Sequence, residues 1–113
     1  MKINNGFCSR CLLVGASLLV SSLAYQAADV AREGAAIFKA ICVMCHRADG
    51  KASSYPKTPN FTDPKWQSST TDKEMREVIK NGKRQTAMPA FGGQLKDEQI
   101  SAVIAYIRSL KKK

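Results

Sequence analysis

The stretch AICVMCHRADG, residues 40–50, contains two thiols three positions apart and, directly after the second, the only histidine of the chain. Cys42, Cys45 and His46 occupy positions i, i+3 and i+4, which share one face of a helical turn. The three side chains are therefore expected to project toward one common object. The chemistry of this C-x-x-C-H pattern decides how the rest of the chain is interpreted.

Four kinds of site compete for the pattern. A structural zinc site normally needs four Cys or His ligands, and no distant second half is found once Cys8 and Cys11 are set aside. A disulfide between Cys42 and Cys45 would close a very small loop and leave His46 unexplained. A thioredoxin-like redox pair belongs near a βαβ pattern, and no strand-like alternation lies nearby. The pattern favours the fourth site, the covalent attachment of haem c.

One haem c attached here would use all three side chains. The two thiols would form thioethers to the vinyl groups along one porphyrin edge, and His46 would lie under the iron as the proximal ligand. Val43 and Met44 lie between the cysteines and are not required for this chemistry. Packing is the expected role of Met44.

The first 24 residues have the layout of a secretory signal peptide. Lys2 and Arg10 precede an apolar run from Leu12 to about Ala24, and the segment contains no acidic residue. This run is shorter than the roughly 20 residues that a membrane-spanning helix needs. An uncleaved anchor is therefore the less favoured interpretation, and membrane contact is expected only through partner complexes.

Cleavage is expected after Ala24, with Ala27 and Ala28 as alternatives, and it would discard the first cysteine pair. Residues 25–113 would then form one domain in the periplasm. Removing 24 of the 113 residues leaves 89, which is a small number from which to build an adequate hydrophobic core. A large prosthetic group would help to fill such a core.

The chain is strongly basic, with 18 Lys and Arg against nine Asp and Glu and a formal charge of +9. An exported chain rarely meets nucleic acid, and no nucleic-acid-binding motif is present. The charge instead favours docking to redox partners with acidic surfaces. Five basic residues could ring an exposed haem edge, although a generally solvated surface is the alternative: Arg47, Lys51, Lys80, Lys83 and Arg84.

The sixth ligand of the iron decides between functions, because an open site binds gases or peroxide and a closed one passes electrons. No second histidine exists, so the candidates are methionines. Met44 lies inside the attachment loop, and Met75 belongs to the apolar stripe of a predicted helix. Met88 precedes Pro89, which favours extended backbone, and it lies away from any helical stripe. Met88 is therefore the predicted iron ligand, and a Met/His pair raises the reduction potential.

Three segments have helical patterns. Residues 29–46 lead into the cysteine motif. Residues 70–82 combine a capping box, Thr71 with Glu74, and an Asn-Gly pair that is expected to end the helix. Residues 97–110 carry apolar side chains at helical spacing. These are Ile100, Val103, Ile104, Ile107 and Leu110.

The 23 residues between His46 and Thr70 show little regular pattern. A loop that long needs a surface to pack on within a compact domain. A haem face would supply this surface, and Tyr55, Phe61 and Trp66 are the apolar side chains available for the packing.

The motifs CVMCH, residues 42–46, and AMPAFGGQLKDEQISAVIAYIRSL, residues 87–110, together resemble the small class I c-type cytochromes of bacterial periplasms. The resemblance covers about residues 31–110. It implies an all-α cytochrome c fold, with three to four helices wrapped around one covalently attached haem c. It also implies His46 and Met88 as the two iron ligands.

The resemblance implies further contacts. Gly34 and Phe38 of the first helix would meet the last helix, where Tyr106 packs. The carbonyl of Pro59 would accept a hydrogen bond from Nδ1 of His46, which fixes the ring and raises its basicity; Pro56 is the competing choice.

Two aromatic residues complete the predicted haem contacts. By the same resemblance, Phe61 would pack against the haem. Trp66 either donates its indole N–H to a haem propionate or only packs against its neighbours.

The resulting prediction is a periplasmic monohaem cytochrome that carries single electrons between redox enzymes. Such a carrier is not an enzyme and needs neither a small-molecule substrate nor catalytic residues. The alternative is a haem c subunit bound permanently in a multi-protein dehydrogenase or sulfur-oxidising complex. A gas- or peroxide-reactive haem protein is a third possibility, which rapid carbon monoxide binding would favour.

Overall fold

The computed structural model describes residues 14–112, so Cys8, Cys11 and the predicted basic start of the signal peptide lie outside the described residues. Within that range there are helices and no β-strand, and one isolated bridge joins Ser54 to Lys57. The elements are α1 (Val14–Ile37), the π-helical turn η1 (Phe38–Cys42), α2 (Val43–His46), α3 (Pro64–Ser69), α4 (Asp72–Asn81) and α5 (Asp97–Ser109). Because α1, η1 and α2 are continuous, the helical runs number four, and the predicted all-α class is confirmed.

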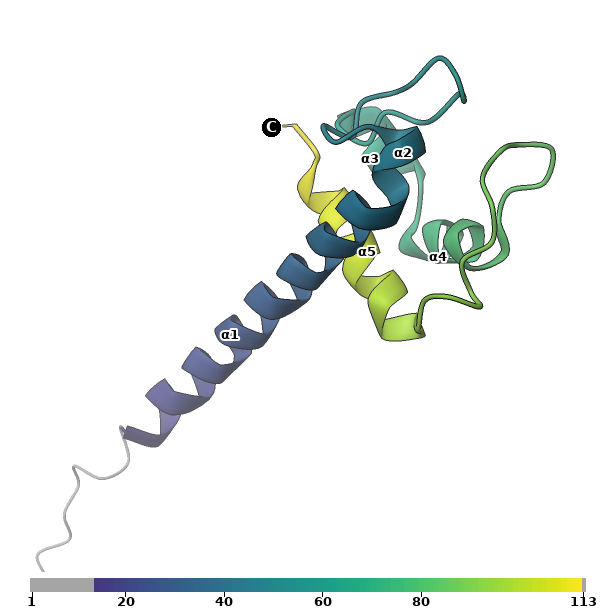
Figure 1. Cartoon of the computed structure of the whole chain (residues 1–113). Helices are drawn as coiled ribbons and strands as arrows, with labels where there is room; N and C mark the ends of the chain where they lie inside the picture. Colours follow the sequence, from purple (N-terminus) through teal and green to yellow (C-terminus); the bar gives the residue numbers. More distant parts are fainter. Residues whose placement is uncertain (1–13, 113) are drawn as a thin grey trace, which may run out of the picture.

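Helix α1 extends well beyond the rest of the domain, and only its C-terminal part packs against α5 (Figure 1). The predicted cleavage site after Ala24 lies within this helix. Between residues 14 and 112, no helix is both long and apolar enough to span a bilayer.

The π-helical turn η1 links α1 to the cysteine motif. The N–H of Val43 bonds to the carbonyl of Phe38, five residues earlier. One extra residue in a turn rotates everything that follows by about 100° around the helix axis, relative to a continuous α-helix. The turn therefore lets Phe38 point into the core, where it is fully buried, while the motif that follows faces a cavity.

Helices α1 and α5 approach closely at Gly34. A Cβ atom at this position would overlap the carbonyl oxygen of Ala102 and lie 3.2 Å from Cβ of Tyr106. One turn later the rings of Phe38 and Tyr106 pack with their centroids 5.1 Å apart. The contact of Gly34 and Phe38 with the last helix, which the resemblance implied, is confirmed.

Gly34→Ala is expected to destabilise the protein by about 1–3 kcal/mol, the usual cost of overpacking a close contact. The change gains about 1 kcal/mol of helix propensity, but the atom that it meets belongs to backbone, which cannot rotate away. Guanidinium unfolding of the purified protein measures the difference. Gly93→Ala is the control, because a Cβ there meets nothing within 4 Å. Equal unfolding midpoints for the two variants would contradict the tight contact.

The segment between α2 and α4 contains a helix that the sequence analysis missed. Helix α3 starts with Pro64, and the side chain of Asp63 caps it by accepting a hydrogen bond from the N–H of Lys65 at 2.9 Å. An Asp-Pro pair is a recognised helix start, so the signal was present. Tyr55, one of the three aromatic side chains available to pack on a haem face, is 94% exposed, at the tip of the turn that the Ser54–Lys57 bridge closes.

Helix α4 begins and ends as predicted. The N–H of Glu74 donates to the hydroxyl of Thr71 at 3.2 Å, and a carboxylate oxygen of Glu74 accepts the N–H of Thr71 at 2.7 Å. Gly82 follows the helix with φ at +73°. Helix α5 has only half of such a box, because Gln99 accepts the N–H of Lys96 at 3.0 Å and the Lys96 side chain makes no capping bond.

Buried Gln67 ties α3 to α5 and to the loop before it. Its Nε2 donates to the carbonyl of Phe61 at 2.7 Å and to that of Ile107 at 2.8 Å. Its Oε1 accepts from Arg108 at 2.9 Å. Because a buried polar side chain is stable only when it is hydrogen-bonded, this network holds Phe61 at a defined place against the core.

Candidate functional site

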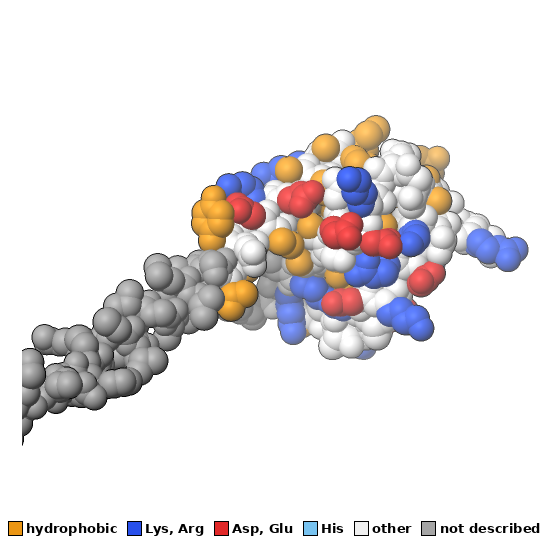
Figure 2. All heavy atoms as spheres, turned by 90° about the horizontal axis from the view of Figure 1, so that it is seen from below, with side chains coloured by type: hydrophobic (Ala, Val, Ile, Leu, Met, Phe, Trp, Pro, Cys, Tyr) orange, Lys and Arg blue, Asp and Glu red, His pale blue; other side chains and the backbone are white. Residues whose placement is uncertain are grey.

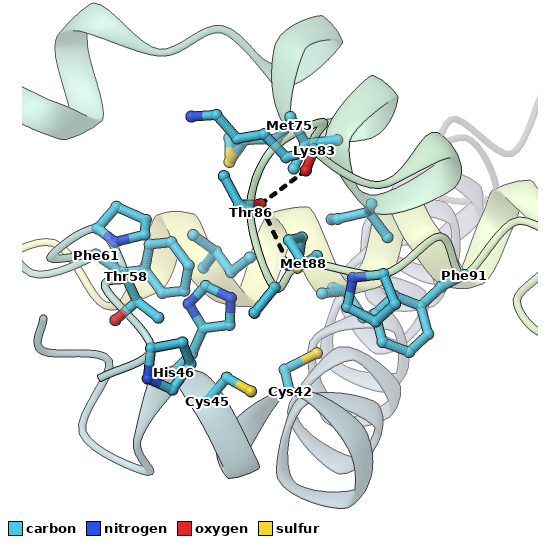
Figure 3. Close-up of a pocket in the computed structure, with 18 of the residues that line it drawn as sticks. Cys42, Cys45, His46, Thr58, Phe61, Met75, Lys83, Thr86, Met88 and Phe91 are labelled. Carbon is cyan, nitrogen blue, oxygen red and sulfur yellow. Dashed lines mark hydrogen bonds between the residues drawn. The ribbon is translucent and has the colours of Figure 1, made fainter. Parts of the chain in front are cut away.

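A cavity of about 1160 Å³ lies between η1–α2, the loop before α3, and the chain that runs from α4 to α5 (Figure 3). Its walls are mostly apolar side chains. It brings together every residue that the sequence analysis assigned to a site, although they come from segments far apart in the chain. These residues are Cys42, Cys45, His46, Pro59, Phe61, Trp66 and Met88.

One wall carries the cysteine motif. Cys42, Cys45 and His46 point from the same helical segment toward the interior (Figure 3). Both cysteines are free thiols. Burial, with a smaller contribution from the neighbouring Cys45, raises the pKa of Cys42 to about 11, so this group is a neutral thiol at pH 7. Among residues 14–112 no three His, Cys, Asp or Glu side chains gather in a way that could hold a metal ion.

His46 is half-buried and held by an aromatic neighbour. Its ring stacks on that of Phe61, with centroids 4.8 Å apart and planes inclined by 20°. Phe61 is itself fixed, because its N–H donates to the carbonyl of Gly50 at 2.8 Å. Burial lowers the pKa of His46, so the imidazole is neutral at pH 7 and can offer a nitrogen lone pair to a metal.

The predicted hydrogen bond from His46 to Pro59 is not formed in this structure. Nδ1 of His46 is buried and has no hydrogen-bond partner within residues 14–112. Pro59 and the competing Pro56 both line the cavity, so their positions do not decide which of the two carbonyls would accept the hydrogen bond from His46. A buried polar atom without a partner costs about 1–3 kcal/mol. Nδ1 of His46 can therefore still form one hydrogen bond.

Met88 lies across the cavity from the cysteine motif and is half-buried (Figure 3). Met75 also lines the cavity but is 6% exposed and belongs to the core, as predicted. The prediction that Met44 packs is wrong, because it is 86% exposed. Met44 is among the residues that line the cavity, but most of its side chain faces solvent.

The site fits haem c in its donor set and in its space. Two thiols and a neutral imidazole lie on one wall, and a thioether lies on the facing wall. A group with large apolar faces would cover the apolar side chains that line this cavity, and each Å² of apolar surface removed from water contributes about 25 cal/mol.

Three of the five basic residues predicted to surround the haem edge form ion pairs with acidic residues. Lys80 pairs with Asp97 at 2.9 Å, and Arg47 and Lys51 both pair with Asp49, at 3.3 and 3.6 Å. Hydrogen bonding from the Lys51 backbone N–H, and then from Arg47, lowers the pKa of Asp49, which keeps this carboxylate ionised.

Two lysines stand at the cavity itself. Lys83, which was predicted, and Lys57, which was missed because its loop has no pattern, both line the cavity. Arg84 is exposed beside Lys83. On the face shown in Figure 2, acidic and basic side chains are interspersed rather than segregated. The lysines at the rim of the cavity are thus the basic groups best placed near a bound cofactor.

Comparison with known sequences connects this geometry to a family. A family model described as cytochrome c oxidase, cbb3-type, subunit III matches residues 29–107. Cytochrome c6 of Thermosynechococcus vestitus is 35% identical over 101 residues, which are 89% of this chain and 88% of the relative. The FixP subunit of a Bradyrhizobium cbb3-type cytochrome c oxidase is 38% identical over 80 residues, which are 71% of this chain. The chain spans only 27% of the length of that subunit.

Solved structures show the same fold. The KustC0563 c-type cytochrome matches with a TM-score of 0.65 and 28% identity, over 70% of this chain and 98% of the other. The dihydro-heme d1 dehydrogenase NirN, solved in complex with DHE, matches with a TM-score of 0.59 and 33% identity. That match covers 67% of this chain and 16% of NirN.

Proposed function

Since the chain belongs to the small class I c-type cytochromes, in the family described as cytochrome c oxidase, cbb3-type, subunit III, we propose that it binds one haem c and carries single electrons between redox partners. The observation that carries this proposal is the cavity in which Cys42, Cys45 and His46 face Met88. Haem c, when bound, supplies reversible one-electron chemistry at its iron.

Different residues of the chain would hold different parts of the haem. Cys42 and Cys45 would bind the macrocycle through thioether bonds, and His46 and Met88 would bind its iron. Phe61 is 5% exposed and packs against Trp66 with ring centroids 4.9 Å apart. This aromatic pair would keep water from one side of the cavity.

Besides the two cysteines, His46 and the two lysines, the cavity contains few ionisable groups. Glu74 is the only carboxylate that lines it within residues 14–112. The hydrogen bonds from the backbone and hydroxyl of Thr71 lower the pKa of Glu74, which remains ionised as part of a helix cap.

Export to the periplasm, with cleavage after Ala24, is part of the proposal. Residues 23–33 of α1 are exposed, apart from half-buried Asp29, and Gly34 is the first buried residue after them. Removal of the chain up to Ala24 would therefore take nothing from the core described here. The basic and then apolar pattern of the first 24 residues supports the same step.

A small anionic oxidant tests the electrostatic part of the proposal. Ferricyanide should oxidise the ferrous protein at a rate that falls with added salt, because Lys57 and Lys83 at the cavity attract the anion. The double change Lys57→Glu/Lys83→Glu should slow this reaction roughly tenfold at low salt, the lower end of the range for electrostatic steering. Stopped-flow absorbance measures the rate.

Lys111→Glu/Lys112→Glu is the matched control, because it changes the net charge equally at exposed residues that do not line the cavity. This variant should retain most of the rate. If both variants slow equally, net charge rather than the cavity lysines governs the approach of partners.

A second candidate is a haem c subunit of a larger enzyme. The FixP matches favour it, since those relatives are oxidase subunits and this chain corresponds to about a quarter of their length. Size-exclusion chromatography of the native protein separates the two candidates. Co-elution with a catalytic subunit favours the second, and elution as a small free protein favours the carrier.

A further inference from the structure

The loop that presents Met88 is closed by its own backbone and attached to α4. The N–H of Lys83 donates to the carbonyl of Met88 at 3.1 Å. Farther along, the N–H of Phe91 donates to the carbonyl of Ile79 at 2.9 Å, and the N–H of Gly92 to that of Lys80 at 3.0 Å. The base of the loop therefore moves with α4, while the part between Lys83 and Met88 must be ordered locally.

Thr86 orders that part with its hydroxyl. Its Oγ1 donates to the carbonyl of Lys83 at 2.8 Å and accepts the N–H of Met88 at 3.2 Å (Figure 3). Its own N–H also donates to the carbonyl of Lys83 at 3.2 Å. Gln85, in the left-handed region with φ at +60°, turns the chain so that Thr86 faces back toward Lys83. Both backbone polar groups of Met88 are thus used within the loop.

We propose that Thr86 is a positioning residue for Met88, whose thioether it holds in the direction of the cavity. This inference rests on the proposed role of Met88 as an iron ligand. The hydroxyl of Thr86 is the only side-chain group within residues 14–112 that bonds to the backbone of Met88. The other bond, from Lys83, joins backbone to backbone and does not depend on a side chain.

The physical reason is the flexibility of methionine. Its side chain has three rotatable bonds and restrains itself poorly. If the backbone at Met88 were also flexible, iron binding would have to order both the side chain and the backbone, at a larger entropic cost. Pro89 restricts the chain on the C-terminal side, because its ring fixes φ. Thr86 restricts the N-terminal side, so the thioether is presented from a backbone that is already ordered.

The exposure of Thr86 makes a clean test possible. Thr86→Val keeps the shape of the side chain and removes both hydroxyl bonds, and water can reach the groups that are released because the residue is exposed. Global unfolding should therefore change little, whereas opening of the Met88 loop should become easier. A local effect without a global one separates positioning from general stability.

The experiment uses the ferric holoprotein and cyanide as a probe that binds iron only after the thioether has left. In Thr86→Val, cyanide should bind roughly 2- to 10-fold faster than in the unmodified protein, the factor that corresponds to the loss of one hydrogen bond. The ferric thioether-to-iron absorption band should weaken, and the denaturation midpoint should not move. Thr86→Ser, which retains the hydroxyl, should bind cyanide at nearly the original rate.

Ser53→Ala is the control. Ser53 does not line the cavity, and its hydroxyl donates to the carbonyl of Tyr55 at 3.2 Å on the loop that follows the cysteine motif. The change should leave the cyanide rate unchanged. Equal acceleration in Ser53→Ala and Thr86→Val would overturn the proposal, because any loosened loop would then have the same effect.

The measurements distinguish a failure of this proposal from a failure of the ligand assignment. If the unmodified protein has the thioether band but Thr86→Val binds cyanide at the original rate, Thr86 does not position Met88. If the unmodified protein lacks the band, Met88 is not the ligand, and both statements fall.

Discussion

Met88→Leu is expected to abolish the ferric thioether-to-iron absorption band and to lower the reduction potential. Leucine has a similar volume but no sulfur, so the wall of the cavity is kept while the ligand is lost. Axial ligands tune haem potentials over roughly 0.8 V, and the Met/His pair lies toward the high end. The fall should therefore be a substantial part of that range. Absorption spectroscopy and a potentiometric titration of the purified holoprotein measure both effects.

The same substitution at two other methionines provides the controls. Met75→Leu changes a core residue that also lines the cavity, and Met44→Leu changes one that is 86% exposed. Both variants should keep the band and the potential. If Met75→Leu removed the band while Met88→Leu kept it, the ligand assignment would move to α4.

Carbon monoxide adds an independent measurement. The ferrous protein should bind it slowly, because the thioether of Met88 must first leave the iron, and Met88→Leu should bind it rapidly. Rapid binding by the unmodified protein would support a gas-reactive haem protein instead of an electron carrier.

The double variant Cys42→Ala/Cys45→Ala should lose all covalently bound haem and most of its helical structure. The thioethers are the proposed covalent link, and the haem would fill a cavity of about 1160 Å³ in a domain with a small core. Without that link the group can dissociate, and the apolar walls are left without a partner. Mass spectrometry after denaturation should give the mass of the bare polypeptide, and far-UV circular dichroism should show the loss of helix.

The other cysteine pair of the chain supplies the matched control. Cys8→Ala/Cys11→Ala alters the same spacing in a segment whose second cysteine is followed by Leu12 rather than by histidine. This variant should keep its haem in a host that is competent for haem attachment. Covalent haem in the Cys42→Ala/Cys45→Ala protein, or its loss in the Cys8→Ala/Cys11→Ala protein, would refute the assignment of the attachment site.

Local patterns in the sequence predicted the ends of α4 and α5 well. Thr71 and Glu74 lie within one helical turn of each other, so their capping box depends on no distant residue. Helix α3 could have been predicted in the same way from Asp63 and Pro64, but a segment of only six helical residues shows no apolar period of its own.

Surface exposure was harder to predict, because side chains of the same type meet different surroundings. Tyr55 and Trp66 were equally plausible cavity residues by type, yet Tyr55 is 94% exposed at the tip of a turn. Lys80 and Lys83 were equally plausible free cations, yet Lys80 pairs with Asp97, 17 positions away. Neither difference is visible in a local window, since each depends on a turn or on a distant partner.

The sequence by itself determined the chemistry of the site and the class of the fold. The cysteine motif and the proline after Met88 act over a few residues, and spacing within a turn is a local property of the chain. The resemblance placed Gly34 against the last helix, but only the tertiary structure decided that it meets the backbone of Ala102, that a π-helical turn directs the motif into the cavity, and that Thr86 bonds to the backbone of Met88. The first of these contacts joins helices separated by most of the domain, and the other two depend on the path that packing imposes on the backbone, which residue spacing alone does not specify.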